Sequence, residues 1–226
     1  MNNIILTPTG GEEYVIEGGD FGRALVRSTA LETAGKFEEA CRIRFEAFQQ
    51  LMAVVPENEE CNLSWEDGPT RDGLTLVKFS AIDHFLVGDM EMAAGMLELL
   101  LDLDPEDHLD ATTTLAYCYV ALGEDELFDE AVADLPEQSA DRALLMLWSA
   151  FRRTGSLPPD GLEWLGRDFP ALLAEFRADN HPADELYLAD IEAAHPSQQA
   201  RARELWLRTE HLWRRFHGFV EALKAR

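Results

Sequence analysis

The side chains best suited to chemistry in this chain are carboxylates, which crowd residues 102–110. Alternate carboxylates in a loop can ligate a hard cation such as Ca²⁺. The acids of this run are Asp102, Asp104, Glu106, Asp107 and Asp110. A calcium loop of the EF-hand type needs glycine at its sixth position, where Asp107 stands, and a bidentate acid at its twelfth, where Thr113 stands. We therefore predict no metal site here, but a turn in which Asp107 or Asp110 caps the following helix.

Motifs for catalysis are missing from the sequence. It has no GxSxG, no HExxH and no phosphate loop with its lysine, and GGDFG at residues 18–22 lacks the GxGxxG spacing. None of the six histidines stands four residues from another, and His84 falls in a helical pattern where a packed side chain is expected rather than a ligand. We predict a protein that is not an enzyme and uses no cofactor or metal. The alternative is an enzyme whose convergent acid, base or metal site the sequence does not reveal.

The cysteines and most tryptophans have simple interpretations. Cys41, Cys61 and Cys118 are odd in number and widely spaced, which indicates reduced thiols rather than disulfides or zinc ligands. The tryptophans that lie within helical apolar stripes are predicted core residues: Trp148, Trp164, Trp206 and Trp213. Trp65 lies in a polar loop, where it is either a plug over the core or an anchor for a partner.

Charge is the unusual property of the chain. Its 19 basic and 43 acidic residues give a formal net charge of −24, which argues against nucleic acid and anionic membranes as partners. Residues 57–141 hold 23 acids and two bases, a net of −21, whereas residues 197–226 hold seven bases and three acids, a net of +4. We predict either a solvated acidic face or a surface for a basic protein or peptide. No segment matches a signal peptide or a membrane-spanning helix, so we expect a cytoplasmic protein.

Two kinds of element must position these side chains. Residues 1–20 contain two short β-favouring runs around Gly10 and Gly11, which predict a hairpin. From residue 21 onward the apolar residues recur at helical spacing. Glycines interrupt this pattern at intervals of 53, 35 and 32 residues, at Gly35, Gly88, Gly123 and Gly155. Treating the polar stretch 57–73 as an insertion brings the first interval into register with the others.

This register resembles the tetratricopeptide repeat. The clearest copy begins at Leu74 and fills the characteristic small, glycine, large, alanine and proline positions with Ala81, Gly88, Met90, Ala93 and Pro105. Copies that begin at Phe21, Leu109 and Asp141 match less completely, and the bulk of Phe128 and Trp148 at positions for small residues implies altered packing. The resemblance covers residues 21–155 and implies an all-α fold, a right-handed superhelix of antiparallel helix pairs.

Residues 156–226 are predicted to continue and cap this solenoid with further helices. Prolines punctuate them at Pro158, Pro159, Pro182 and Pro196. The last helix, residues 197–225, carries a wide apolar stripe that must be covered.

Members of the repeat family bind extended peptides or helices on a concave face. On this chain the resemblance implies that the peptide contacts are Lys78, Phe85, Asp110, Thr113 and Tyr117, together with Thr75, Ile82 and Val120. We predict a non-catalytic adaptor or chaperone-like module that binds a basic peptide or helix in an acidic groove. The alternative is a structural, self-assembling homo-oligomer in which the last helix fills its own or a neighbour's groove.

Overall fold

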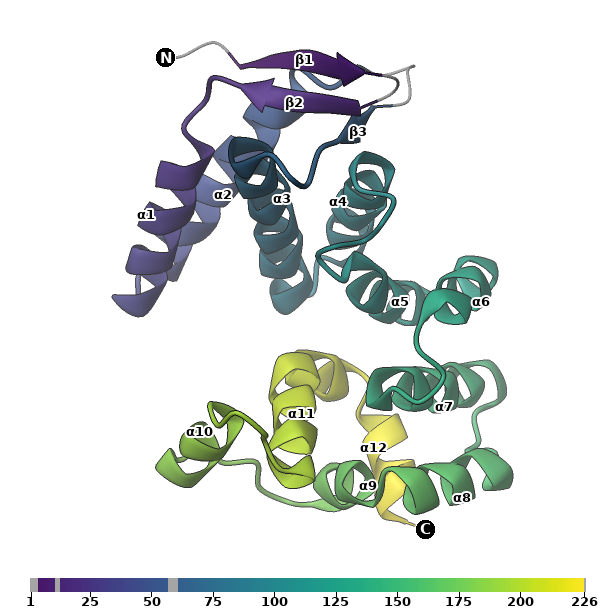
Figure 1. The fold of residues 1–226 in the computed structure, drawn as a ribbon. Coiled ribbons are helices and arrows are strands. Elements are labelled where there is room, and N and C mark those ends of the chain that lie inside the picture. Colours follow the sequence, from purple (N-terminus) through teal and green to yellow (C-terminus); the bar gives the residue numbers. More distant parts are fainter. Residues whose placement is uncertain (1–3, 11–12, 57–60, 226) are drawn as a thin grey trace. The chain divides into compact units, whose positions relative to one another are not determined.

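The protein is mostly helical, with a short β-hairpin at its N-terminus (Figure 1). The computed structural model describes residues 4–10, 13–56 and 61–225. The chain divides into two compact units, Met1–Cys118 and Tyr119–Arg226, here called the N-terminal and C-terminal units. The described residues form twelve helices and three strands, as the predicted all-α class with a hairpin requires. Within them, no helix combines the length and apolar character needed to span a membrane.

A small sheet opens the N-terminal unit. Strands β1 (Ile5–Gly10) and β2 (Glu13–Glu17) pair antiparallel, which confirms the predicted hairpin; the predicted turn residue Gly11 lies outside the described residues. A third strand, β3 (Asn62–Leu63), pairs parallel with β2 and completes the order β1-β2-β3. The sequence predicts residues 57–73 only as a polar insertion, so β3 is an element that it does not indicate.

Four helices follow in pairs. The first pair is α1 (Phe21–Thr33) and α2 (Phe37–Met52), and the second is α3 (Gly68–Val87) and α4 (Met90–Leu103). Helix α3 packs against α1, α2 and α4, so it is the centre of this unit. Helix α5 (Ala111–Leu122) spans the boundary between the units.

Helix α3 begins earlier than the repeat pattern predicted. Residues 68–73 belong to the helix, although the sequence interpretation placed them in the polar insertion. The Asp67 carboxylate accepts a hydrogen bond from the Thr70 amide at 2.9 Å, and Pro69 occupies the first turn, where its missing N–H costs no helical bond. These local signals fix the start of the helix at Gly68.

The four glycines found in the sequence lie where helices end. Gly35, Gly88, Gly123 and Gly155 have φ values of 73°, 86°, 84° and 73°, a left-handed conformation that glycine adopts without steric cost. They follow α1, α3, α5 and α7, so the predicted breaks between helices are confirmed. Ala81 and Ala93 are fully buried in the pair α3–α4, where the repeat pattern asks for small residues. The stacking of successive pairs into a superhelix stays a prediction.

The sheet meets the helices at the first turns of α3. The Ile16 amide donates to Thr70 Oγ1 at 2.9 Å, and both residues are buried. A side chain at Gly73 would place its Cβ 3.0 Å from Ile16 Cδ1, so this glycine lets β2 approach the helix closely. The contact joins an apolar core on α3 that includes Leu74 and Val77.

A buried ion pair ties the first three helices together. Arg44 on α2 is only 3% exposed. It donates to Glu32 on α1 at 2.7 Å and to Asp83 on α3 at 3.0 Å. Since a buried charge is tolerated only when it is paired, these contacts fix the relative positions of α1, α2 and α3.

The C-terminal unit is made of shorter helices. After the end of α5 come α6 (Asp125–Asp134), α7 (Ala140–Thr154) and α8 (Pro159–Asp168). The chain continues through α9 (Pro170–Arg177), α10 (Glu185–Ile191), α11 (Gln198–Arg215) and α12 (His217–Lys224). The prediction of one last helix over residues 197–225 is wrong, because the helix breaks at Phe216 and restarts as α12.

An aromatic core holds this unit together. Trp148 on α7 is fully buried and contacts Trp213 on α11, with ring centroids 5.0 Å apart, and Phe216, at 5.2 Å. Phe176 on α9 lies 5.2 Å from the same Trp213 ring. Trp148 stands where the repeat pattern asks for a small residue, and its bulk fills the space against α11. The apolar stripe of the last helices is therefore covered within its own unit.

Candidate functional site

The predicted peptide contacts of the N-terminal unit are mostly core residues. Phe85 and Tyr117 are each 2% exposed, and their rings lie 6.4 Å apart. Thr113 is 8% exposed. Lys78 Nζ donates to the Asp110 carbonyl at 2.8 Å, which joins α3 to the start of α5. The structure thus brings the five predicted contact residues, Lys78, Phe85, Asp110, Thr113 and Tyr117, into one region. There their described contacts are with other residues of the same chain.

The acidic run at residues 102–110 forms a tight turn between α4 and α5. Asp107 Oδ1 accepts from the Ala111 amide at 2.5 Å and Oδ2 from the Thr112 amide at 3.1 Å, so Asp107 caps α5 as predicted. Asp107 and Asp110 adopt left-handed φ values of 51° and 54°, which Asp tolerates better than most residues. Among the described residues, no group of three or more His, Cys, Asp or Glu side chains could hold a metal ion.

His108 occupies the centre of this turn. Its Nδ1 lies 2.7 Å from Asp104 Oδ1, and the Asp104 carboxylate is almost fully buried. Its Nε2 lies 3.4 Å from Glu106. The hydrogen bond with Asp104 is the largest cause that raises the pKa of His108 above its ordinary value of 6.5, and nearby negative charges, including Glu66, act in the same direction.

Trp65 stacks on His108. The two rings are nearly parallel, at 6°, with centroids 4.8 Å apart. The Arg71 guanidinium lies 5.8 Å from the centre of the Trp65 ring. Trp65 is half-buried, so part of its surface stays accessible.

An acidic pocket of about 390 Å³ opens beside this stack. Its described lining residues come from β2, from β3 with the residues after it, and from the turn between α4 and α5: Glu13, Asn62, Leu63, Trp65, Glu66, Asp104, Pro105, Glu106 and His108. Four of them are carboxylic acids, and the described lining holds no lysine or arginine. Sequence reasoning found Trp65 and the run 102–110 separately. The sequence does not indicate that Trp65 and this run lie close to Glu13, because only the pairing of β3 with β2 brings these segments together.

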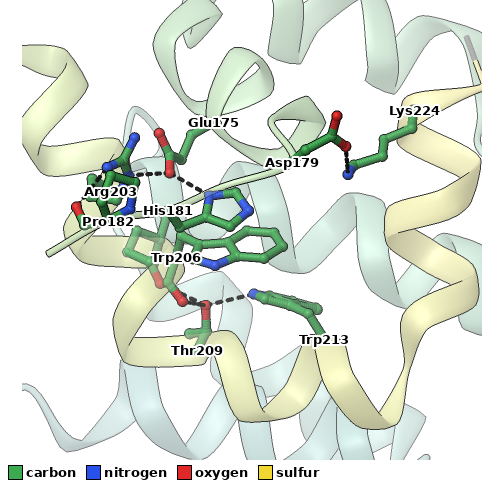
Figure 2. A network of polar contacts seen from close by, with 10 residues as sticks. Glu175, Asp179, His181, Pro182, Arg203, Trp206, Thr209, Trp213 and Lys224 are labelled. Carbon is green, nitrogen blue, oxygen red and sulfur yellow. Dashed lines mark hydrogen bonds and ion pairs between the residues drawn. The ribbon is translucent and has the colours of Figure 1, made fainter.

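The C-terminal unit contains a second polar cluster, shown in Figure 2. Glu175, which is 8% exposed, lies 2.6 Å from His181 Nδ1 and accepts a hydrogen bond from Arg203 Nε. Arg203 also donates to the Pro182 carbonyl at 2.8 Å, and the His181 ring stacks on Trp206 at 3.8 Å. This cluster fastens the segment after α9 to α11.

A His side chain paired with a Glu can act as a general base. Here both side chains instead hold neighbouring segments together, Glu175 by its contact with Arg203 and His181 by stacking on Trp206. The His181 side chain is only 12% exposed and lies flat on Trp206. The neighbouring ion pair of Lys224 with Asp179, at 2.8 Å, fastens the same segment to α12 (Figure 2). We therefore interpret this cluster as structural: it holds the segment after α9 against α11 and α12.

The cysteines lack the character of nucleophiles. Burial raises the pKa of the Cys118 thiol to about 12 and, together with the negative charge of Asp83, that of Cys41 to about 11. Burial also raises the pKa of Cys61. Since the thiolate is the reactive form, these thiols are poorly reactive at neutral pH.

Comparison with protein-family models, with curated proteins and with solved structures finds no match for this chain. The acidic pocket and its aromatic stack are therefore the basis for a functional proposal.

Proposed function

We propose that the N-terminal unit is a non-catalytic binding module for a basic peptide segment, with a lysine or arginine side chain of the partner in the acidic pocket. The observation that carries the proposal is a pocket of about 390 Å³ with four carboxylic acids and no lysine or arginine in its described lining. A partner's cation would add to the counter-charge of His108, which contacts Asp104 and Glu106.

The pocket offers two kinds of contact to such a side chain. Glu13, Glu66 and Glu106 are exposed, so their carboxylates can accept charge-assisted hydrogen bonds from an ammonium or guanidinium group. The ring of Trp65 and the neighbouring Leu63 and Pro105 offer an apolar surface for the aliphatic stem.

This pocket is distinct from the groove that the repeat resemblance implies. None of Lys78, Phe85, Asp110, Thr113 and Tyr117 is among its described lining residues. The proposed partner is still basic, as the sequence predicts. Its binding site is now the acidic turn and the sheet instead of the repeat groove. It also takes Trp65 as a partner anchor, one of the two roles considered for it from the sequence.

Calorimetric titration of the full chain with a short peptide of alternating lysine and alanine tests the proposal. We expect saturable binding that weakens as ionic strength rises, because salt screens exposed charges. The Glu13→Gln variant should bind about two- to fivefold more weakly, the range expected for one exposed ion pair.

Glu17→Gln is the matched control for this variant. Glu17 is an exposed glutamate on the same strand but is not among the described lining residues, so its loss should leave the affinity unchanged. Equal weakening in both variants would show a diffuse charge effect, and equal binding of a peptide with glutamine in place of lysine would refute the pocket as a cation site.

The self-assembling alternative has less support. It was motivated by a wide apolar stripe on residues 197–225, which needs a cover. Within the C-terminal unit this stripe packs against α9 and Trp148. No neighbour is needed to cover it, so we favour the binding module.

A further inference from the structure

His108 is the one basic side chain in the described lining of the acidic pocket. Its ring lies among four carboxylic acids of that lining. When the ring is protonated, it is a cation that already lies where the proposed function puts the cation of a partner. The two ring nitrogens have different surroundings, and this difference determines what the loss of the proton does to the pocket.

The Nδ1 atom of His108 faces a buried partner. It lies 2.7 Å from Asp104 Oδ1, and the Asp104 side chain is only 4% exposed. Oδ2 of the same carboxylate accepts from the His108 amide at 2.9 Å, and the ring also stacks on Trp65. A neutral imidazole keeps one N–H. The tautomer with its hydrogen on Nδ1 therefore preserves the bond to Asp104 and the position of the ring.

The Nε2 atom faces an exposed partner. It lies 3.4 Å from Glu106 Oε2, and the Glu106 side chain is 84% exposed. In the protonated ring, the N–H at this position attracts the Glu106 carboxylate. In the neutral tautomer that keeps the bond to Asp104, Nε2 carries only a lone pair, so this attraction is lost. Loss of the proton therefore makes Glu106 available to the ammonium or guanidinium group of a partner.

The groups around His108 favour its protonated form. The hydrogen bond with Asp104 is the largest cause that raises the pKa of His108 above 6.5, and nearby negative charges act in the same direction, whereas partial burial opposes them. The imidazolium therefore persists above pH 6.5. The charged groups of the surrounding elements are Glu13 on β2, Glu66 after β3, Arg71 on α3, and Asp104 and Glu106 in the turn between α4 and α5.

We propose that binding of a basic partner in the acidic pocket is coupled to loss of the His108 proton, with the partner's cation replacing the imidazolium beside Glu106. This inference rests on the proposed function and adds the regulation of the same site. The pocket binds a cation weakly while His108 is protonated and more tightly once the ring is neutral. Because linkage is reciprocal, a bound cation also weakens the hold of His108 on its proton.

Calorimetric titration of the full chain with the peptide of alternating lysine and alanine, at about pH 5.5 and about pH 8.5, tests this coupling; the lysines stay charged at both values, because their ordinary pKa is about 10.4. We expect the affinity of the wild type to be about two- to fivefold higher at the upper pH, the range expected for one exposed ion pair. His108→Gln should bind the peptide equally at both values, because glutamine does not titrate.

His84→Gln is the matched control. His84 belongs to the same unit and lies 3.2 Å from the Asp89 carboxylate, but it is not among the described lining residues of the pocket. This variant should keep the rise in affinity seen in the wild type.

Nuclear magnetic resonance titration of the wild-type imidazole gives a second measurement that needs no substitution. The pKa of His108 should be lower with the peptide bound than without it. An equal rise in affinity in the wild type and His108→Gln, or a pKa that the peptide leaves unchanged, would overturn the coupling and leave the binding module standing. Absence of saturable binding at both pH values would instead overturn the proposed function, and the coupling with it.

Discussion

His108 belongs both to the turn between α4 and α5 and to the lining of the acidic pocket. Its ring stacks on Trp65, and its Nδ1 bonds to the buried Asp104. The sequence narrowed the cap of α5 to Asp107 or Asp110, and the structure shows that it is Asp107, because a cap depends on neighbours a few residues away. It did not indicate the role of His108, which depends on Trp65, a residue far away along the chain.

The raised pKa of His108 predicts a pH-dependent contribution to stability. A group with a higher pKa in the folded state binds its proton more tightly there, so it stabilises the fold while protonated. This contribution is complete below the ordinary pKa of 6.5 and is lost as pH rises through the higher folded value. We expect the difference in free energy of unfolding between the wild type and His108→Gln to shrink from about pH 5.5 to about pH 8.5.

Urea unfolding at the two pH values measures this difference. His195→Gln provides a control at another histidine. A difference that stays constant or grows with pH would contradict the assigned hydrogen bond.

At the level of elements, the sequence predicts the features that depend on neighbours within a few residues, and it does not predict every helix boundary. The glycine breaks and the hairpin followed from turn chemistry that operates within a few residues. The early start of α3 has the local signals Asp67 and Pro69, whereas the repeat register predicts a later start at Leu74. The break in the last helix has no proline, and only Gly218, two residues after Phe216, hints at it.

Trp148 joins helix α7 to the last helices of the C-terminal unit. The Trp148 side chain is fully buried against Trp213, Phe216 and Phe219. Trp148→Ala would leave a large cavity, so we expect a loss of about 3–5 kcal/mol in the free energy of unfolding. Guanidinium unfolding followed by far-ultraviolet circular dichroism measures this loss.

Met146→Ala is the control on the same helix. Met146 is 45% exposed, so its truncation should cost less than about 0.5 kcal/mol. Similar costs for the two variants would mean that α7 does not anchor the last helices through Trp148.

At the level of the whole molecule, the sequence predicted the class of the fold and the sign of its charge, but not where the charge would form a site. The acidic pocket needs Glu13, residues 62–66 and residues 104–108 together. These segments meet through a two-residue parallel pairing, and such a short strand has no periodicity to recognise. Chemistry that depends on distant segments is therefore the part that sequence reasoning misses.

The net charge of −24 has a consequence for stability. Like charges held in a compact fold repel one another, and the repulsion falls as salt shortens the screening length from about 30 Å at 0.01 M to about 3 Å at 1 M. We expect the thermal midpoint to rise with sodium chloride over this range. The double variant Glu130→Gln and Asp134→Asn removes two exposed charges of α6, so it should start from a higher midpoint and rise less. Ion pairs such as Arg153 with Asp125 and Asp129 are weakened by the same salt. A midpoint that falls with salt would therefore mean that these attractions, rather than the net repulsion, govern the stability of the protein.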